Sequence, residues 1–245
     1  MPWTTRTGLW LTALGAVGFG VLCLAFSHTV QGLEALPKGF TAETPIAWLS
    51  GVLLLALGAG LLVSRISGRA AIGLAALYLV WVLAIHAPPL AVHPTSMIAW
   101  VIATEVLALA GGAMTLAPGR LGAAGPYVFA VNLPVFALSH FVYLDAVAGM
   151  IPDWIPGHVF WAASTGLAHL AAGLAILSGV RARLAAILLG VMYGLISLAT
   201  HLTPVLLDPM GRMAWTNLLL DAALAGAAFA VAGAVKDRRL TKPVT

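Results

Sequence analysis

The residues best suited to chemistry in this chain are histidines and carboxylates that lie within or beside long apolar segments. Four histidines stand where such a segment ends, at His28, His86, His140 and His201. Neutral imidazoles bind haem iron and transition metals, and two facing helices can present two of them to one ligand. We expect His28 with His86, and His140 with His201, to hold a haem, a metal ion or a quinone head group. The alternative is hydration or hydrogen bonding to loop backbone, because polar groups at a membrane surface cost little free energy.

A second set of ionisable residues lies deeper in the apolar segments. Glu105 and Asp221 each stand about nine residues into a segment, which at a rise of about 1.5 Å per residue is near the middle of a bilayer. His169 lies at a similar depth. Ionisable groups there are functional candidates, so we expect a catalytic, proton-handling cluster in which His169 is the partner of Asp221. The alternative is a set of neutral side chains that hydrogen-bond the helices together.

The environment of these residues follows from the composition. Of the 245 residues, 61% are hydrophobic and 8% are charged, against about 25% charged residues in an average soluble domain. Eight apolar runs approach the ~20 residues that cross a bilayer, and backbone groups in lipid must pair internally, which requires helix. The sequence therefore predicts an all-α, polytopic transmembrane helix bundle. The eight predicted spans are residues 8–27, 45–64, 70–87, 96–117, 125–144, 158–178, 185–202 and 213–235.

The predicted spans fall into two halves that repeat one another. Six residue pairs recur at separations of 112, 113, 115, 115, 115 and 116 positions, which is the pattern of a duplicated unit. Four spans return the chain to its starting side, so we expect two parallel-oriented four-helix repeats, residues 1–117 and 126–236. A cytoplasmic linker at 118–125 and a cytoplasmic tail at 237–245 complete the predicted organisation. The pairs are His28/His140, Trp48/Trp161, Gly51/Gly166, His86/His201, Trp100/Trp215 and Glu105/Asp221.

The basic residues predict the orientation in the membrane. With both termini in the cytoplasm, ten basic residues lie inside and only Lys38 and Arg212 lie outside, which is the asymmetry of the positive-inside rule. We expect a multi-pass protein of the cell (inner) membrane, in contact with the lipid bilayer. The formal charge of +4 then reflects topology, and no nucleic-acid partner is expected. The ten residues are Arg6, Arg65, Arg69, Arg120, Arg181, Arg183, Lys236, Arg238, Arg239 and Lys242.

Several motifs in the second half resemble the DoxX-like family of membrane proteins. They are Ser139-His140-Phe141, the proline-bracketed segment 151–156, the segment 164–169 and the basic turn 181–186. We expect the segment 151–156 to form a non-helical lid, because each of its prolines disfavours helix at the residue before it. The resemblance implies a tandem fusion of two four-helix units. Some members of that family resemble subunits of thiosulfate:quinone oxidoreductases.

This chain departs from the family pattern at one position in each half. An acidic residue is expected in the second helix, where this sequence has His169 and, in the first half, Leu54. The expected function is a redox or quinone-interacting membrane subunit that binds haem b or a quinone and works with a redox partner subunit. Two alternatives stay open: a small-molecule transporter or binding protein that uses the same cavity, and a structural membrane subunit without chemistry.

Overall fold

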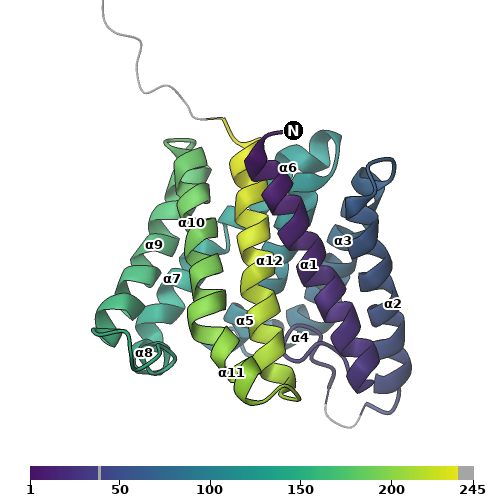
Figure 1. Ribbon diagram of the computed structural model, residues 1–245, viewed down its shortest axis with the longest axis horizontal. Coiled ribbons are helices and arrows are strands. Elements are labelled where there is room, and N and C mark those ends of the chain that lie inside the picture. The colour runs from purple at the N-terminus through teal and green to yellow at the C-terminus, as the bar shows by residue number, and fades with distance from the viewer. Residues whose placement is uncertain (38–39, 237–245) are drawn as a thin grey trace, which may run out of the picture.

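A computed structural model describes residues 1–37 and 40–236, and all regular structure over these residues is helical. Eight helical segments are long and apolar enough to cross a membrane, which confirms the predicted all-α, polytopic bundle (Figure 1). The first four spans are α1 (Trp3–Phe26), α2 (Glu43–Leu62), α3 (Ser67–Trp81) and α5 (Met97–Leu116), and α3 is continued by the π-helix η1 (Val82–His86) and by α4 (Ala87–Val92). The fifth span consists of α6 (Gly119–Ala130) and α7 (Leu133–Val142), and the short α8 (Leu144–Gly149) follows it. The last three spans are α9 (His158–Ser178), α10 (Ala182–Ile196) and α12 (Arg212–Ala234), and α10 is continued by the π-helix η2 (Ser197–His201) and by α11 (Leu202–Leu207).

The two ends of the bundle differ in charge. The N-terminus and the end of α12 lie at one end, here called the proximal end, and α4, α8 and α11 lie at the opposite, distal end (Figure 1). The described members of the predicted cytoplasmic set, from Arg6 to Lys236, belong to the helix ends and connections of the proximal end. Arg212 begins α12 at the distal end. Four residues of the count lie outside the described residues: Lys38, Arg238, Arg239 and Lys242.

The helix boundaries repeat along the chain with a nearly constant offset. α3, η1 and α4 begin at residues 67, 82 and 87, and α10, η2 and α11 begin 115 positions later, at 182, 197 and 202. α2 and α9 begin at 43 and 158, and α5 and α12 begin at 97 and 212, which is the same offset. α1 and α6 begin at 3 and 119, an offset of 116. Three of the predicted pairs are therefore in register: Gly51/Gly166, His86/His201 and Trp100/Trp215.

The predicted match between His28 and His140 is wrong. α1 ends before His28, whereas His140 lies inside α7. With the offset of 116 for this helix pair, His140 corresponds to Leu24 (140 − 116 = 24). The contacts agree, because Leu24 packs beside Gly51 and His140 packs beside Gly166. The Ser-His string therefore recurs one helical turn out of register. Two other pairs stand one and two residues away from the 115-residue register: Glu105/Asp221 and Trp48/Trp161.

The two π-helices lie directly before prolines. A proline has no N–H, and its ring clashes with the carbonyl four residues earlier in a helix. Pro88 and Pro89 follow η1, and Pro204 follows η2, so the helix widens over the preceding turn. Each π-helix ends on a histidine, His86 or His201. The prolines thereby fix the two histidines at equivalent places near the distal end.

The two halves interlock and do not pack as separate bundles. α1 packs along α12 of the second half as well as along α2, and α6 packs along α5 of the first half. α1 and α12 lie side by side in the middle of the molecule (Figure 1). Gly226 of α12 lies against the backbone of Thr12, and Gly111 of α5 lies against the backbone of Phe129. Since small residues let helices approach closely in lipid, these glycines bring the halves together around one core.

The connections between spans differ in part from the sequence prediction. The segment 118–125, which we expected to be a linker, is helical from Gly119 and forms the first turns of α6. The helix is broken instead at Val131 and Asn132, because Pro134 supplies no N–H to the preceding turn. The segment 151–156 is not helical, as predicted.

Substitution of Gly226 or Gly111 by alanine should lower the stability by about 1–3 kcal/mol each, because the added methyl group must push two helices apart. The apparent Tm of the purified protein in detergent measures the effect. Gly194→Ala is the matched control, since a Cβ there meets no atom within 4 Å and alanine favours helix. Its Tm should stay or rise, and an unchanged Tm in all three variants would contradict the close approach.

Candidate functional site

A polar cluster is centred on α9, which packs against both α7 and α10 (Figure 1). His169 of α9 is buried at its centre, and both of its ring nitrogens are engaged. Nδ1 lies 2.7 Å from the Thr165 carbonyl oxygen, which only accepts, so Nδ1 carries the proton. Nε2 is then the acceptor of the neutral ring, and the Tyr193 hydroxyl donates to it at 3.0 Å. This chain of hydrogen bonds ties α9 to α10.

His140 of α7 lies beside His169 and presents an open nitrogen. The centroids of the two rings are 4.9 Å apart. Nδ1 of His140 donates to the Phe136 carbonyl at 2.7 Å, which leaves Nε2 as the acceptor of the neutral ring. This Nε2 has no hydrogen-bond partner in the part of the chain that the structure describes. His140 is therefore placed to accept a proton or a hydrogen bond from a ligand.

Two carboxyls complete the cluster. His201 Nε2 lies 3.2 Å from Asp221 Oδ2. The two atoms are not aligned for a hydrogen bond, so Oδ2 is buried without a hydrogen-bond partner among residues 1–37 and 40–236. Glu105 of α5 and His140 are both within electrostatic range of Asp221. The cluster thus draws ionisable side chains from α5, α7, α9, η2 and α12.

The structure brings the three residues of the predicted proton-handling cluster into one neighbourhood, but the predicted pairing is wrong. His169 is not the partner of Asp221, because both nitrogens of its ring are already bound, one to Thr165 and one to Tyr193. The imidazole closest to Asp221 belongs to His201. The spacing of these residues in the sequence predicted their depth in the membrane, but it did not predict which helix each side chain faces.

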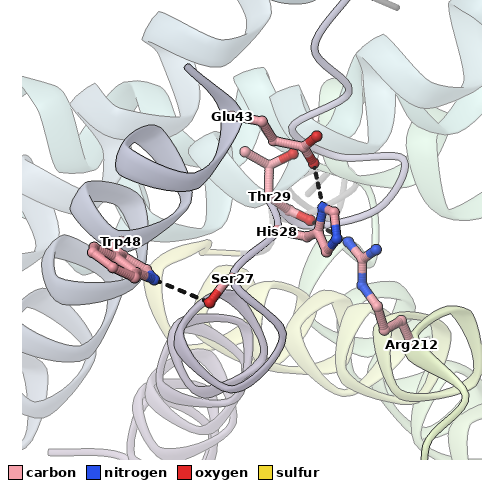
Figure 2. Close-up of polar contacts among 6 residues, drawn as sticks. All are labelled: Ser27, His28, Thr29, Glu43, Trp48 and Arg212. Carbon is pink, nitrogen blue, oxygen red and sulfur yellow. Dashed lines mark hydrogen bonds and ion pairs between the residues drawn. The ribbon is translucent and has the colours of Figure 1, made fainter. Parts of the chain in front are cut away.

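The other two of the four histidines predicted as ligands, His28 and His86, lie apart from this cluster. His28 Nδ1 donates to Glu43 Oε1 at 2.9 Å (Figure 2). His86 Nε2 donates to the Leu33 carbonyl oxygen at 2.8 Å and is buried. His28 and His86 are therefore bound to two different partners and do not form the expected pair.

The donor set does not fit a bis-histidine haem or a metal ion. His86 Nε2 is bound to Leu33, and His201 Nε2 faces Asp221, so neither expected histidine pair offers two open Nε2 atoms. In the described ranges, no three His, Cys, Asp or Glu side chains have the arrangement of metal ligands. Proton exchange and hydrogen bonding are the chemistry that this arrangement supports.

In the first half, the place that corresponds to the polar cluster is filled by the segment of chain that follows α1. With the offset of 115, Leu54 corresponds to His169, so the imidazole has no counterpart there. The chain that follows α1 folds inward instead, and Val30, Leu33 and Glu34 are all buried. The Leu33 carbonyl, held by His86, lies within this inward turn. In the first half, the connection after α1 therefore fills this place, whereas in the second half the polar cluster occupies it.

Sequence reasoning missed two residues of these networks. Tyr193 is not among the predicted site residues, although tyrosines at 78 and 193 repeat at the offset of 115. Glu34 is not among them either, yet its side chain is 2% exposed and accepts from Ser50 Oγ at 2.5 Å. Burial raises the pKa of Glu34 from 4.5 to about 7, against the hydrogen bond from Ser50, which lowers it. No signal in the sequence distinguished Glu34 from an exposed loop residue.

Comparison of the chain with protein-family models, with curated proteins and with solved structures gave no match.

Tyr193→Phe should destabilise the protein by about 1–3 kcal/mol, because the buried Nε2 of His169 loses its donor. Tyr78→Phe is the matched control, since Tyr78 is the repeat counterpart and lies on the half that has Leu54 in place of the imidazole. Its effect on the apparent Tm in detergent should be small. Equal losses in the two variants would show that ring packing, and not the hydrogen bond, sets the cost.

The stability of the protein should fall as the pH rises from 4.5 through 7. Glu34 has a pKa of about 7 in the folded chain against 4.5 in the reference state, so the folded state binds the proton more tightly over this interval. The stabilisation of about 3 kcal/mol is complete below pH 4.5 and is lost above pH 7. Unfolding in detergent at several pH values measures it, and Glu34→Gln should flatten the profile. An equal slope in that variant would assign the effect to other groups.

Proposed function

We propose that this protein is a quinone-interacting membrane subunit whose second half binds the quinone head group. The observation that carries the proposal comes from the first half, where His86 Nε2 donates to a carbonyl oxygen, that of Leu33. His201 stands in the same register, at the end of the equivalent π-helix, and receives no backbone carbonyl among the described residues. A quinone supplies two carbonyl oxygens on an apolar ring. One of them would accept a hydrogen bond from His201 Nε2, as the Leu33 carbonyl does from His86 Nε2, because the His201 nitrogen lies 3.2 Å from Asp221 Oδ2 but is not aligned for a hydrogen bond to it.

The neighbouring groups suit proton exchange with such a ligand. Conversion of a quinone into a quinol takes up two electrons and two protons. Asp221 and Glu105 offer carboxyl groups, and His140 Nε2 offers an open base, within one cluster. The electrons would come from a redox partner subunit, because none of these side chains carries them.

The membrane, the orientation and the family belong to the same proposal. The basic proximal end supports a cytoplasmic location of both termini in the cell inner membrane. Gly51 and Gly166, in register in the second span of each half, and the non-helical segment 151–156 support membership of the DoxX-like family as a tandem fusion.

Titration of the purified protein with a short-chain ubiquinone analogue tests the proposal. His201→Gln and Asp221→Asn should each weaken binding roughly tenfold or more, because each removes a directional or charged partner. His93→Gln is the matched control, since His93 is an exposed histidine at the distal end. Quinone should also appear in the lipid extract of the wild-type protein. Failure to detect it there, together with no binding in the titration, would refute the proposal.

One observation favours a second candidate, a proton-coupled small-molecule transporter. Glu105 of the first half and Asp221 of the second half approach one another where α5 packs on α12. Repeat-built transporters place their substrate and ion sites at such an interface between repeats. Transport requires that Asp221→Asn abolish substrate uptake at unchanged protein level. A purely structural subunit requires that the joint change of His140, His201 and Asp221 leave the activity of a partner complex intact.

A further inference from the structure

A cavity of about 320 Å³ lies at the proximal end of the second half. It is lined by the first turns of α6, the end of α9, the start of α10 and the end of α12 with the residues that follow it (Figure 1). Its volume falls within the roughly 300–1,000 Å³ that small-molecule sites occupy. Because all four spans end or begin at this level, the cavity lies where the bundle leaves the apolar part of the bilayer.

In the first half, the corresponding place is covered by the chain itself. Ala182, which lines the cavity at the start of α10, corresponds to Ser67 at the start of α3. Beside Ser67, Gly68 lies against Pro118 of the α5–α6 connection. After α12, the described chain ends at Lys236, which lines the cavity. Within the described residues, the second half therefore leaves open a place that the first half covers.

The charge around the cavity is positive. Lys236 lies in its wall and is exposed, and the exposed Arg181 directly precedes the wall residue Ala182. The exposed Arg120 lies on the same turn of α6 as the wall residues Gly122 and Ala123. All carboxylates of the described residues lie in the middle of a span or at the distal end. Charge complementarity therefore favours an anionic ligand at the proximal end.

The wall further into the bundle is apolar. Pro126 of α6 lies about one helical turn deeper than Gly122, and Ile176 and Leu177 of α9 face the same space. Tyr127 of α6 also lines the cavity and is 54% exposed, so this side reaches the surface that meets lipid. Tyrosines are enriched where the acyl region of a bilayer meets the head groups. A ligand with an anionic head and apolar chains matches both parts of the wall.

We propose that this cavity binds an anionic phospholipid of the surrounding membrane, with its phosphate near Lys236 and Arg181 and its acyl chains beside α6 and α9. Basic pockets between transmembrane helices recognise such head groups. The segment of this chain after Lys236 suits the cavity less, because residues 237–242 carry three basic residues and one acidic residue. A zwitterionic lipid would bring its own ammonium group to the basic residues. A free inorganic anion would leave the apolar wall uncovered.

Native mass spectrometry of the full-length protein in detergent tests the proposal. The probes are phosphatidylglycerol, phosphatidylcholine with the same acyl chains, and inorganic phosphate. We expect phosphatidylglycerol to bind roughly tenfold more tightly than phosphatidylcholine, because each basic residue near an anionic head group strengthens binding about fivefold. Inorganic phosphate at about 10 mM should not displace the lipid, since it gains nothing from the apolar wall.

Two matched pairs of variants separate the cavity from the general charge of the proximal end. Lys236→Gln should weaken phosphatidylglycerol binding about fivefold, whereas Arg65→Gln removes an exposed charge of the same end outside the cavity and should have little effect. Ala123→Leu fills part of the cavity and should weaken binding roughly tenfold. Ala124→Leu, at the neighbouring exposed position outside the wall, should leave binding unchanged. All four positions are exposed, so the variants are expected to fold.

Equal binding of the two lipids, or equal effects within either pair of variants, would overturn the proposal. Displacement of the lipid by inorganic phosphate would assign the cavity to a free anion instead. Faster tryptic cleavage after Arg238 on addition of phosphatidylglycerol would assign it to the chain's own segment, which the lipid would then displace. The outcome is independent of quinone binding, because the cavity shares no residue with the cluster around His169.

Discussion

The rest of this structure depends on the requirement that backbone groups within lipid find partners inside the protein. Prolines within the spans withhold donors, and the helices change geometry around them. Two spans widen into the π-helices η1 and η2, and a third breaks before α7, where Asn132 Nδ2 donates to the Val128 carbonyl at 2.6 Å. His86 and His201 occupy the ends of the widened turns. One histidine of the candidate site, His201, is therefore located where the backbone departs from a regular α-helix.

The two halves have equivalent helix boundaries but different interiors. In the first half, an apolar Leu54 and an inward-folded connection exclude water and hold a buried carboxyl, Glu34, against Ser50. In the second half, an imidazole replaces that leucine, and a tyrosine hydroxyl satisfies it. The equivalent helix boundaries of the two halves are nonetheless mostly 115 positions apart, so different buried polar groups fit the same arrangement of the backbone.

Hydropathy was sufficient to predict the eight spans, because membrane insertion depends on the length and composition of a segment and hardly on its neighbours. The period of the repeat could be read from residues that lie within regular helix, such as Gly51 and Gly166. It failed for His28 and His140, because a short string recurred one turn away from the helix register. Partners across helices were also beyond the sequence. The depth of His169 was readable, but which helix it faces depends on packing, and the burial of Glu34 depends on how a connection folds.

The packing of α1 against α12 of the other half has a consequence for the order in which the protein folds. α1 leaves the ribosome before α12, its main partner in the other half, and six other spans are made between them. The small-residue face of α1 must therefore stay in lipid, covered only in part, until α12 has been synthesised.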